Sequence, residues 1–186
     1  MSSPVNAAPT APAKFVVKPQ TAGHQRPVQK LLNLAFGPGR LAKSSYRFRE
    51  GVKPINALSF VAEYLDNTHE TLAGSIRYWP ILIGPNAEEK MTDALLLGPL
   101  AVAPDMQGKG AGMALMQVSL EKAKELGHKI VVLVGDEPYY ARIGFSKVPA
   151  GLVQMPQPYD PDRLLWLELV PGAFESVRGV MTKAPA

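Results

Sequence analysis

The chain has 186 residues, 46% of them apolar, with no cysteine and a formal net charge of +4. The lack of cysteine excludes disulfides, thiolate metal sites and a cysteine nucleophile. The lysines and arginines are scattered, so the contiguous basic patch of a nucleic-acid-binding protein is missing. No run approaches the roughly 18 apolar residues that a membrane span needs.

Residues 1–13 are small, polar and rich in proline, without the basic start and apolar run of a secretory signal. We predict a flexible tail over 1–13, one folded domain over 14–186 and a cytoplasmic protein. The basic balance is compatible with an anionic cofactor.

The first half of the domain shows helical spacing followed by a hairpin pattern. Val28, Leu31 and Leu32 recur at helical spacing, and Gly37 ends that segment. Two β-rich runs flank a polar turn, and Pro80 predicts a bulge or an edge position in the second run. The expected elements are a strand over 14–19, a helix over 24–36, a shorter helix within 40–51, and antiparallel strands over 57–66 and 74–84.

The second half predicts a βαβ unit around a glycine-rich turn. A near-continuous apolar run over 94–102 is typical of a strand covered on both faces. The turn QGKGAG precedes a helix over 113–126 and a buried strand over 129–135, so the two strands are expected to be parallel neighbours. The apolar face of this helix is expected to consist of Met113, Met116, Leu120, Ala123 and Leu126, with Gly127 as the C-cap. We also expect one or two helical turns within 136–145 and a strand over 164–170. Taken together, these elements predict an α/β domain with a mixed sheet, antiparallel in its early strands and parallel around the glycine-rich turn.

The glycine-rich turn has two readings. Unpaired N–H groups at a helix N-terminus, with no side chains at Gly108, Gly110 and Gly112, suit a phosphate. Alternatively, the glycines make only a tight turn that lets the helix pack on the sheet. The spacing fits neither the nucleotide P-loop nor the dinucleotide fingerprint.

Three motifs in order resemble the GNAT superfamily of N-acetyltransferases, over about residues 95–148. Leu100-Ala101-Val102 precedes the turn, Gln107, Gly110 and Gly112 occupy it, and Tyr140, Gly144 and Phe145 match a Y-x-x-x-G-F pattern after the next strand. The double tyrosine and the later stretch WLELVPGAF look like the YhbS-type branch of that superfamily.

This resemblance implies a GNAT-like fold in which two parallel strands splay apart to hold acetyl-CoA. A bulge, or a kink at Pro99 or Pro104, would help to open that edge. The pyrophosphate would lie on the backbone of the turn, and the pantetheine arm would pair with the preceding strand. The implied acetyl-CoA-binding residues are Leu100, Ala101, Val102, Gln107, Gly108, Lys109, Gly110, Ala111 and Gly112.

The implied reaction is direct attack of a primary amine on the thioester, without a metal. Tyr140 matches the family's general acid, and a backbone N–H near Val102 matches its oxyanion donor. A tyrosine with a pKa of about 10 does not fully protonate a thiolate with a pKa of about 8.5 in water, so we expect a hydrogen bond that strengthens as sulfur leaves. Tyr139 is expected in the core or in the pocket wall. Glu63 is our candidate base, with Glu168 as the alternative.

The sequence leaves the acceptor open. Arg47 or Arg49 would meet an acidic acceptor group if their segment walls the site, or would lie on a solvated helix face. We predict an N-acetyltransferase that uses acetyl-CoA and an amine, with a homodimer possible and no nucleic-acid partner. The alternatives are a transferase for another acyl-CoA and a catalytically silent CoA-binding module.

Overall fold

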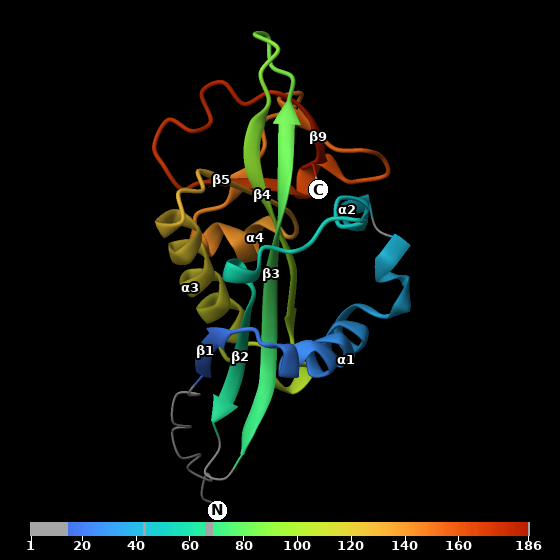
Figure 1. Cartoon of the computed structure of the whole chain (residues 1–186), viewed down its shortest axis with the longest axis vertical. Helices are drawn as coiled ribbons and strands as arrows, with labels where there is room; N and C mark the ends of the chain where they lie inside the picture. The colour runs from blue at the N-terminus through green and yellow to red at the C-terminus, as the bar shows by residue number, and fades with distance from the viewer. Residues whose placement is uncertain (1–14, 43, 66–68, 186) are drawn as a thin grey trace, which may run out of the picture.

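A computed structural model describes residues 15–42, 44–65 and 69–185 (Figure 1). The predicted tail over 1–13 lies outside the described residues. The fold in the described part is a nine-stranded mixed sheet with the order β1-β2-β3-β4-β5-β8-β6, in which β9 pairs with β3 and β7. The strands are β1 (Phe15–Pro19), β2 (Phe60–Leu65), β3 (Glu70–Gly84), β4 (Thr92–Val102), β5 (Ile130–Val134), β6 (Ser146–Lys147), β7 (Val153–Gln154), β8 (Leu164–Glu168) and β9 (Gly179–Lys183).

The described part of the chain has four α-helices, and the two longest, α1 and α3, make most of the helix contacts with the sheet. α1 packs on β3 and β4, whereas α3 packs on β1, β2 and β3, and Figure 1 shows the two helices to either side of the long strand β3. The helices are α1 (Gln25–Phe36), α2 (Ser44–Arg47), α3 (Ala111–Glu125) and α4 (Glu137–Tyr140). None of the described helices is both long and apolar enough to cross a membrane.

The predicted hairpin is confirmed, with β2 antiparallel to β3. On the side of β3 away from β4, β2 pairs as far as Ile76 and β9 begins at Ile81. Pro80 falls in the gap between these partners, where a missing N–H breaks no ladder bond on that side. The shorter helix expected within 40–51 is confirmed as α2, which a 3-10 segment over Pro38–Ala42 precedes.

The predicted βαβ unit is also confirmed, since β4 and β5 are parallel neighbours joined through α3. Their paired residues are Leu95 with Val131 and Leu96 with Val132 only. Beyond Leu96 the two strands separate. On its other edge β4 carries one extra residue, because Leu97 pairs with Tyr78 but Leu100 pairs with Ile76. This bulge at the point of separation opens the edge of β4.

The buried face of α3 differs from the predicted stripe. Leu126 is 46% exposed, because it is the C-cap residue and the helical period ends there. Leu115 and Ser119 are fully buried instead. The Ser119 hydroxyl lies 2.7 Å from the Tyr78 hydroxyl and donates to the Leu115 carbonyl, so its burial leaves no unpaired polar group.

Candidate active site

The larger of two neighbouring cavities lies at the N-terminus of α3, with a volume of about 630 Å³. Its walls come from the end of β4, the glycine-rich turn, the end of α1 and α4. Eight of the nine predicted acetyl-CoA-binding residues line it, and Lys109 does not. Those eight are Leu100, Ala101, Val102, Gln107, Gly108, Gly110, Ala111 and Gly112.

The turn presents bare backbone to this cavity. Gly108 and Gly110 have φ values of 73° and 97°, a region that side chains disfavour. Among the described residues, a Cβ at either position would meet no atom within 4 Å, and no side chain caps α3. The N–H groups of the first helical turn have no partner within the helix. The arrangement is therefore able to bind an anion such as a phosphate.

Gly112 is required for a different reason, which is contact with Tyr139. A Cβ on Gly112 would lie 2.3 Å from the Tyr139 hydroxyl oxygen. Tyr139 lines both cavities, with its ring edge-on to Tyr140 at 5.0 Å between centroids. The absent side chain at position 112 thus lets α4 approach α3.

The free edge of β4 offers backbone groups to the larger cavity. The N–H of Ala103 donates to the Ala73 carbonyl of β3 at 2.8 Å. In an antiparallel ladder alternate residues point to opposite sides, so the N–H groups of Val102 and Leu100 point away from β3. They face the side where β5 has separated. A ligand in extended form is able to pair there as an added strand.

Tyr140 lies where the two cavities meet and lines both. Its ring packs against Gly135, where a Cβ would lie 2.3 Å from Cε2, and contacts Phe145 edge-on at 5.9 Å. Burial, and to a lesser degree the neighbouring Tyr139, raise the pKa of Tyr140 to about 12. The hydroxyl is therefore protonated, and able to donate a hydrogen bond, at any physiological pH.

The smaller cavity, of about 270 Å³, occupies the gap where β4 and β5 diverge. It shares five lining residues with the larger cavity, which are Phe36, Leu100, Asp136, Tyr139 and Tyr140. Its other walls are the bulge of β4, the end of β5, the α2 region and three arginines, Arg40, Arg49 and Arg163. The two cavities therefore meet at Tyr140 and Leu100.

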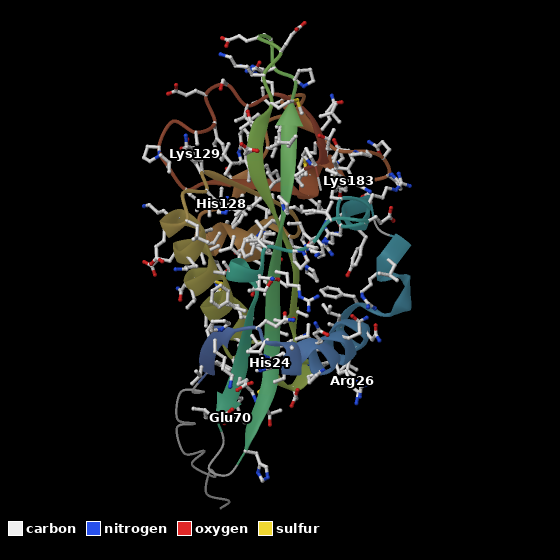
Figure 2. The ribbon with its side chains drawn as sticks, in the orientation of Figure 1. His24, Arg26, Glu70, His128, Lys129 and Lys183 are labelled. Carbon is white, nitrogen blue, oxygen red and sulfur yellow. The ribbon has the colours of Figure 1, made fainter. Side chains whose placement is uncertain are left out.

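Glu63 lies apart from both cavities. It is 7% exposed on β2, in an ion pair with Lys18 and 3.2 Å from Nε2 of His24. Burial alone would raise the pKa of Glu63, but hydrogen bonds led by that from Lys18 lower it below its ordinary value. Figure 2 shows His24 and Glu70, which also pairs with Lys18, toward the same end of the molecule. Glu168 also lines neither cavity, and its carboxylate accepts a hydrogen bond from the Phe174 N–H.

Comparison with known proteins gives this site a family. A model described as the acetyltransferase (GNAT) family matches residues 26–145, more than half of the chain. The chain belongs to the GNAT acetyltransferase family.

Individual relatives of this GNAT chain show the same fold. The crystal structure of the GNAT family N-acetyltransferase YhbS from Escherichia coli in complex with CoA superposes with a TM-score of 0.71 at 19% identity, covering 97% of this chain and 94% of that one. A GNAT acetyltransferase from Brucella melitensis in complex with acetyl-CoA has a TM-score of 0.61 at 22% identity, covering 92% and 97% of the two chains.

A sequence relative matches a shorter stretch. The uncharacterized N-acetyltransferase YjhQ from Escherichia coli K12 is 39% identical over 64 residues. That alignment spans 34% of this chain and 35% of YjhQ. The match is therefore confined to about a third of each protein.

Several lining residues of this GNAT site are absent from the motifs. Phe36 comes from the end of α1, Arg142 follows α4, and Arg40 precedes α2. Phe36 and Arg40 lie four positions apart around the end of α1, whereas Arg142 comes about a hundred residues later, and no motif spacing links the three. The fold brings the end of α1 and the segment after α4 to the same pair of cavities, so no sequence pattern marks these residues.

Proposed function

We propose that this GNAT protein transfers the acetyl group of acetyl-CoA to a primary amine in a ternary complex. The observation that carries the proposal is that two cavities meet at one half-buried tyrosine, Tyr140. The larger holds a helix N-terminus suited to an anion and a free strand edge, and the smaller adjoins it at Tyr140 and Leu100. The CoA and acetyl-CoA complexes of the two structural relatives support the same ligand here.

In this proposal the residues of the larger cavity bind acetyl-CoA. The backbone N–H groups of Gly108–Gly112 hold the pyrophosphate, and Arg142, which lines the same cavity, adds positive charge. The outward N–H and carbonyl groups of Leu100 and Val102 pair with the pantetheine arm. These contacts place the thioester beside Tyr140.

The proposed reaction is a balanced acyl transfer. The lone pair of a neutral amine forms a C–N bond to the thioester carbon, and the C–S bond then breaks. The nitrogen loses one proton and the departing sulfur gains one, so the products are an N-acetyl amide and CoA thiol. An N–H of the free β4 edge, that of Val102, donates to the oxyanion, and Tyr140 donates to the sulfur as its charge grows. Because Glu63 and Glu168 line neither cavity, we assign them no step.

Titration calorimetry and a CoA-release assay on wild type and two tyrosine variants test the proposal. We expect Tyr140→Phe to bind acetyl-CoA as tightly as wild type, while kcat falls about 100-fold or more, the range for loss of a general acid. Tyr64→Phe is the matched control, because Tyr64 is half-buried on β2 and lines neither cavity.

Two results would contradict the proposal at different points. If wild type gives no binding heat with acetyl-CoA, the function itself is wrong. If acetyl-CoA binds and Tyr140→Phe turns over like Tyr64→Phe, only the role of Tyr140 is wrong. A homodimer and a cytoplasmic location stay predictions.

A further inference from the structure

The smaller cavity is lined by arginine side chains, and their charge indicates the kind of ligand that it binds. Resting on the proposed function, we infer that the acceptor amine carries a carboxylate, which Arg49 and Arg40 bind in the smaller cavity. The inference follows from the partners of these two arginines, the charge balance of the cavity and its position relative to the larger one.

Arg49 is a charged side chain with unused donors. Its guanidinium carbon lies 4.2 Å from the ring centre of Tyr46 and 5.8 Å from that of Trp79. Both are cation–π contacts with aromatic rings, and neither supplies a carboxylate. Nε and Nη1 are buried and have no hydrogen-bond partner among the described residues. Burial lowers the pKa of Arg49 to about 10, which still leaves it charged at neutral pH.

The guanidinium group of Arg49 lies against Gly98, in the bulge of β4. A Cβ on Gly98 would lie 3.0 Å from Nη2 of Arg49, and Gly98 lines the smaller cavity together with Arg49. The absent side chain at position 98 therefore leaves room for the guanidinium where the strands separate. The cation is held beside the site of acyl transfer.

Arg40 supplies a second cation in the same cavity, and it is more deeply buried than Arg49. It is 4% exposed. Nη1 donates to Asn33 Oδ1 and, at 3.2 Å, to the Gly37 carbonyl, whereas the buried Nε has no partner in the described part of the chain. Asn33 and Gly37 contribute no negative charge. A buried cation without a counter-ion is costly, so an anion from outside is the partner that these residues lack.

The charged side chains that line the smaller cavity also favour a bound anion. Arg163 is the third cation, and its Nη2 lies 3.3 Å from Asp136 Oδ1, so these two charges compensate each other. Asp136 is the only carboxylate side chain lining the cavity among the described residues. Within the described part of the chain, no carboxylate that lines the cavity pairs with Arg40 or Arg49. Planar guanidinium groups match the geometry of a carboxylate, with two parallel N–H donors.

The location separates this anion from the phosphates of the proposed acetyl-CoA. Arg40 and Arg49 line the smaller cavity and not the larger one, where the N-terminus of α3 lies. The two arginines therefore act on the acceptor. A carboxylate bound to them places an amine on the same molecule toward Tyr140, which the two cavities share.

The first test uses wild type and needs no variant. Matched sets of acceptors are assayed for CoA release, each containing an amino acid, its carboxamide and its decarboxylated amine. We expect kcat/KM to be at least tenfold higher for the acid than for the other two members of at least one set, since the neutral analogues leave the guanidinium donors unpaired. Equal or better use of the neutral members in every set would overturn the inference.

The second test compares two arginine variants. Arg49→Met keeps an apolar stem and removes the charge. Arg47→Met is the control, because Arg47 is exposed, lines neither cavity and donates to the Gln157 carbonyl instead. We expect Arg49→Met to raise KM for the acid at least tenfold, with KM for the carboxamide and Kd for acetyl-CoA within twofold of wild type.

The failure of the inference is distinguishable from that of the proposed function. If acetyl-CoA binds and neutral amines are acetylated as readily as acids, or if Arg49→Met affects the acid and the carboxamide equally, only the inference is wrong. If acetyl-CoA does not bind, or no amine in any set is acetylated, the proposed function fails and the inference falls with it.

Discussion

The indole Nε1 of Trp79 donates a 2.7 Å hydrogen bond to the carbonyl oxygen of Gly98. Trp79 is on β3 and Gly98 is in the bulge of β4, at the point where β4 leaves β5. The bond satisfies a carbonyl that the irregular strand pairing leaves without a ladder partner. It therefore holds the bulge in the conformation that separates the strands.

Trp79→Phe is expected to weaken this bulge. The substitution keeps an aromatic ring but removes the donor, which leaves the buried carbonyl of Gly98 unsatisfied. We expect the free energy of unfolding to fall by about 1–3 kcal/mol, and kcat/KM for the acceptor to fall because Gly98 lines the smaller cavity. Urea denaturation and steady-state kinetics measure both. A variant with wild-type stability would show that the bond does not hold the bulge.

Gly112→Ala is expected to disturb the wall between α3 and α4. The new Cβ would lie 2.3 Å from the Tyr139 hydroxyl oxygen, and overpacking of this kind costs about 1–3 kcal/mol. Calorimetry should show weaker acetyl-CoA binding. Gly23→Ala is the control, because its nearest neighbour would be Thr21 Oγ1 at an ordinary 3.7 Å.

A double variant identifies the clash as the cause. In Tyr139→Phe the nearest ring atom, Cζ, lies 3.6 Å from the Cβ position of Gly112, which is ordinary contact. Gly112→Ala combined with Tyr139→Phe should therefore recover most of the stability that Gly112→Ala loses. Additive losses would contradict this explanation.

The pH dependence of kcat reports the state of Tyr140. Its pKa is raised to about 12 from an ordinary value near 10, because burial favours the neutral hydroxyl. The tyrosine therefore stays protonated as pH rises through 10. We expect kcat to rise as the acceptor amine deprotonates and then to hold level up to pH 10.5. A falling limb centred near pH 10 that Tyr140→Phe removes would contradict the raised pKa.

Glu63 is expected to contribute to stability and not to catalysis. Glu63→Gln removes charge-assisted hydrogen bonds from a buried carboxylate and should lower the free energy of unfolding by about 1–3 kcal/mol at pH 7. Because the folded pKa of Glu63 is lowered, its stabilisation is present above the unfolded pKa and is lost as pH falls through the folded value. The difference between wild type and variant should therefore shrink as pH falls below about 4.

Two measurements check this role. Glu88→Gln is the matched control for stability, since Glu88 and its partner Lys90 have side chains 68% and 71% exposed, and a loss of about 0.5 kcal/mol or less is expected. The transfer rate of Glu63→Gln should stay within twofold of wild type. A hundredfold loss of kcat without a change in the folded fraction would show that Glu63 takes part in catalysis.

Local pattern was enough to predict the βαβ unit and the turn at its centre. Gly108, Gly110 and Gly112 lie next to one another, and the apolar runs on either side are continuous, so neighbours in sequence specify this structure. The same holds for α1, whose buried Val28, Leu31 and Leu32 follow the helical period. The amphipathic stripe of α3 failed at Leu126 because periodicity does not show where a helix ends.

The character of the smaller cavity depends on segments that meet only in the folded chain. As a sequence feature, Arg49 is one of two arginines in a short polar segment, and nothing nearby distinguishes it from Arg47. Packing against Tyr46 and Trp79 leaves Arg49 half-buried, with Nε and Nη1 fully buried, whereas Arg47 is exposed. Likewise, Glu63 is a carboxylate on a strand until Lys18 and His24 approach it. The burial of a side chain and its ion pairs depend on neighbours that are distant in sequence, and residue spacing does not show which neighbours these are.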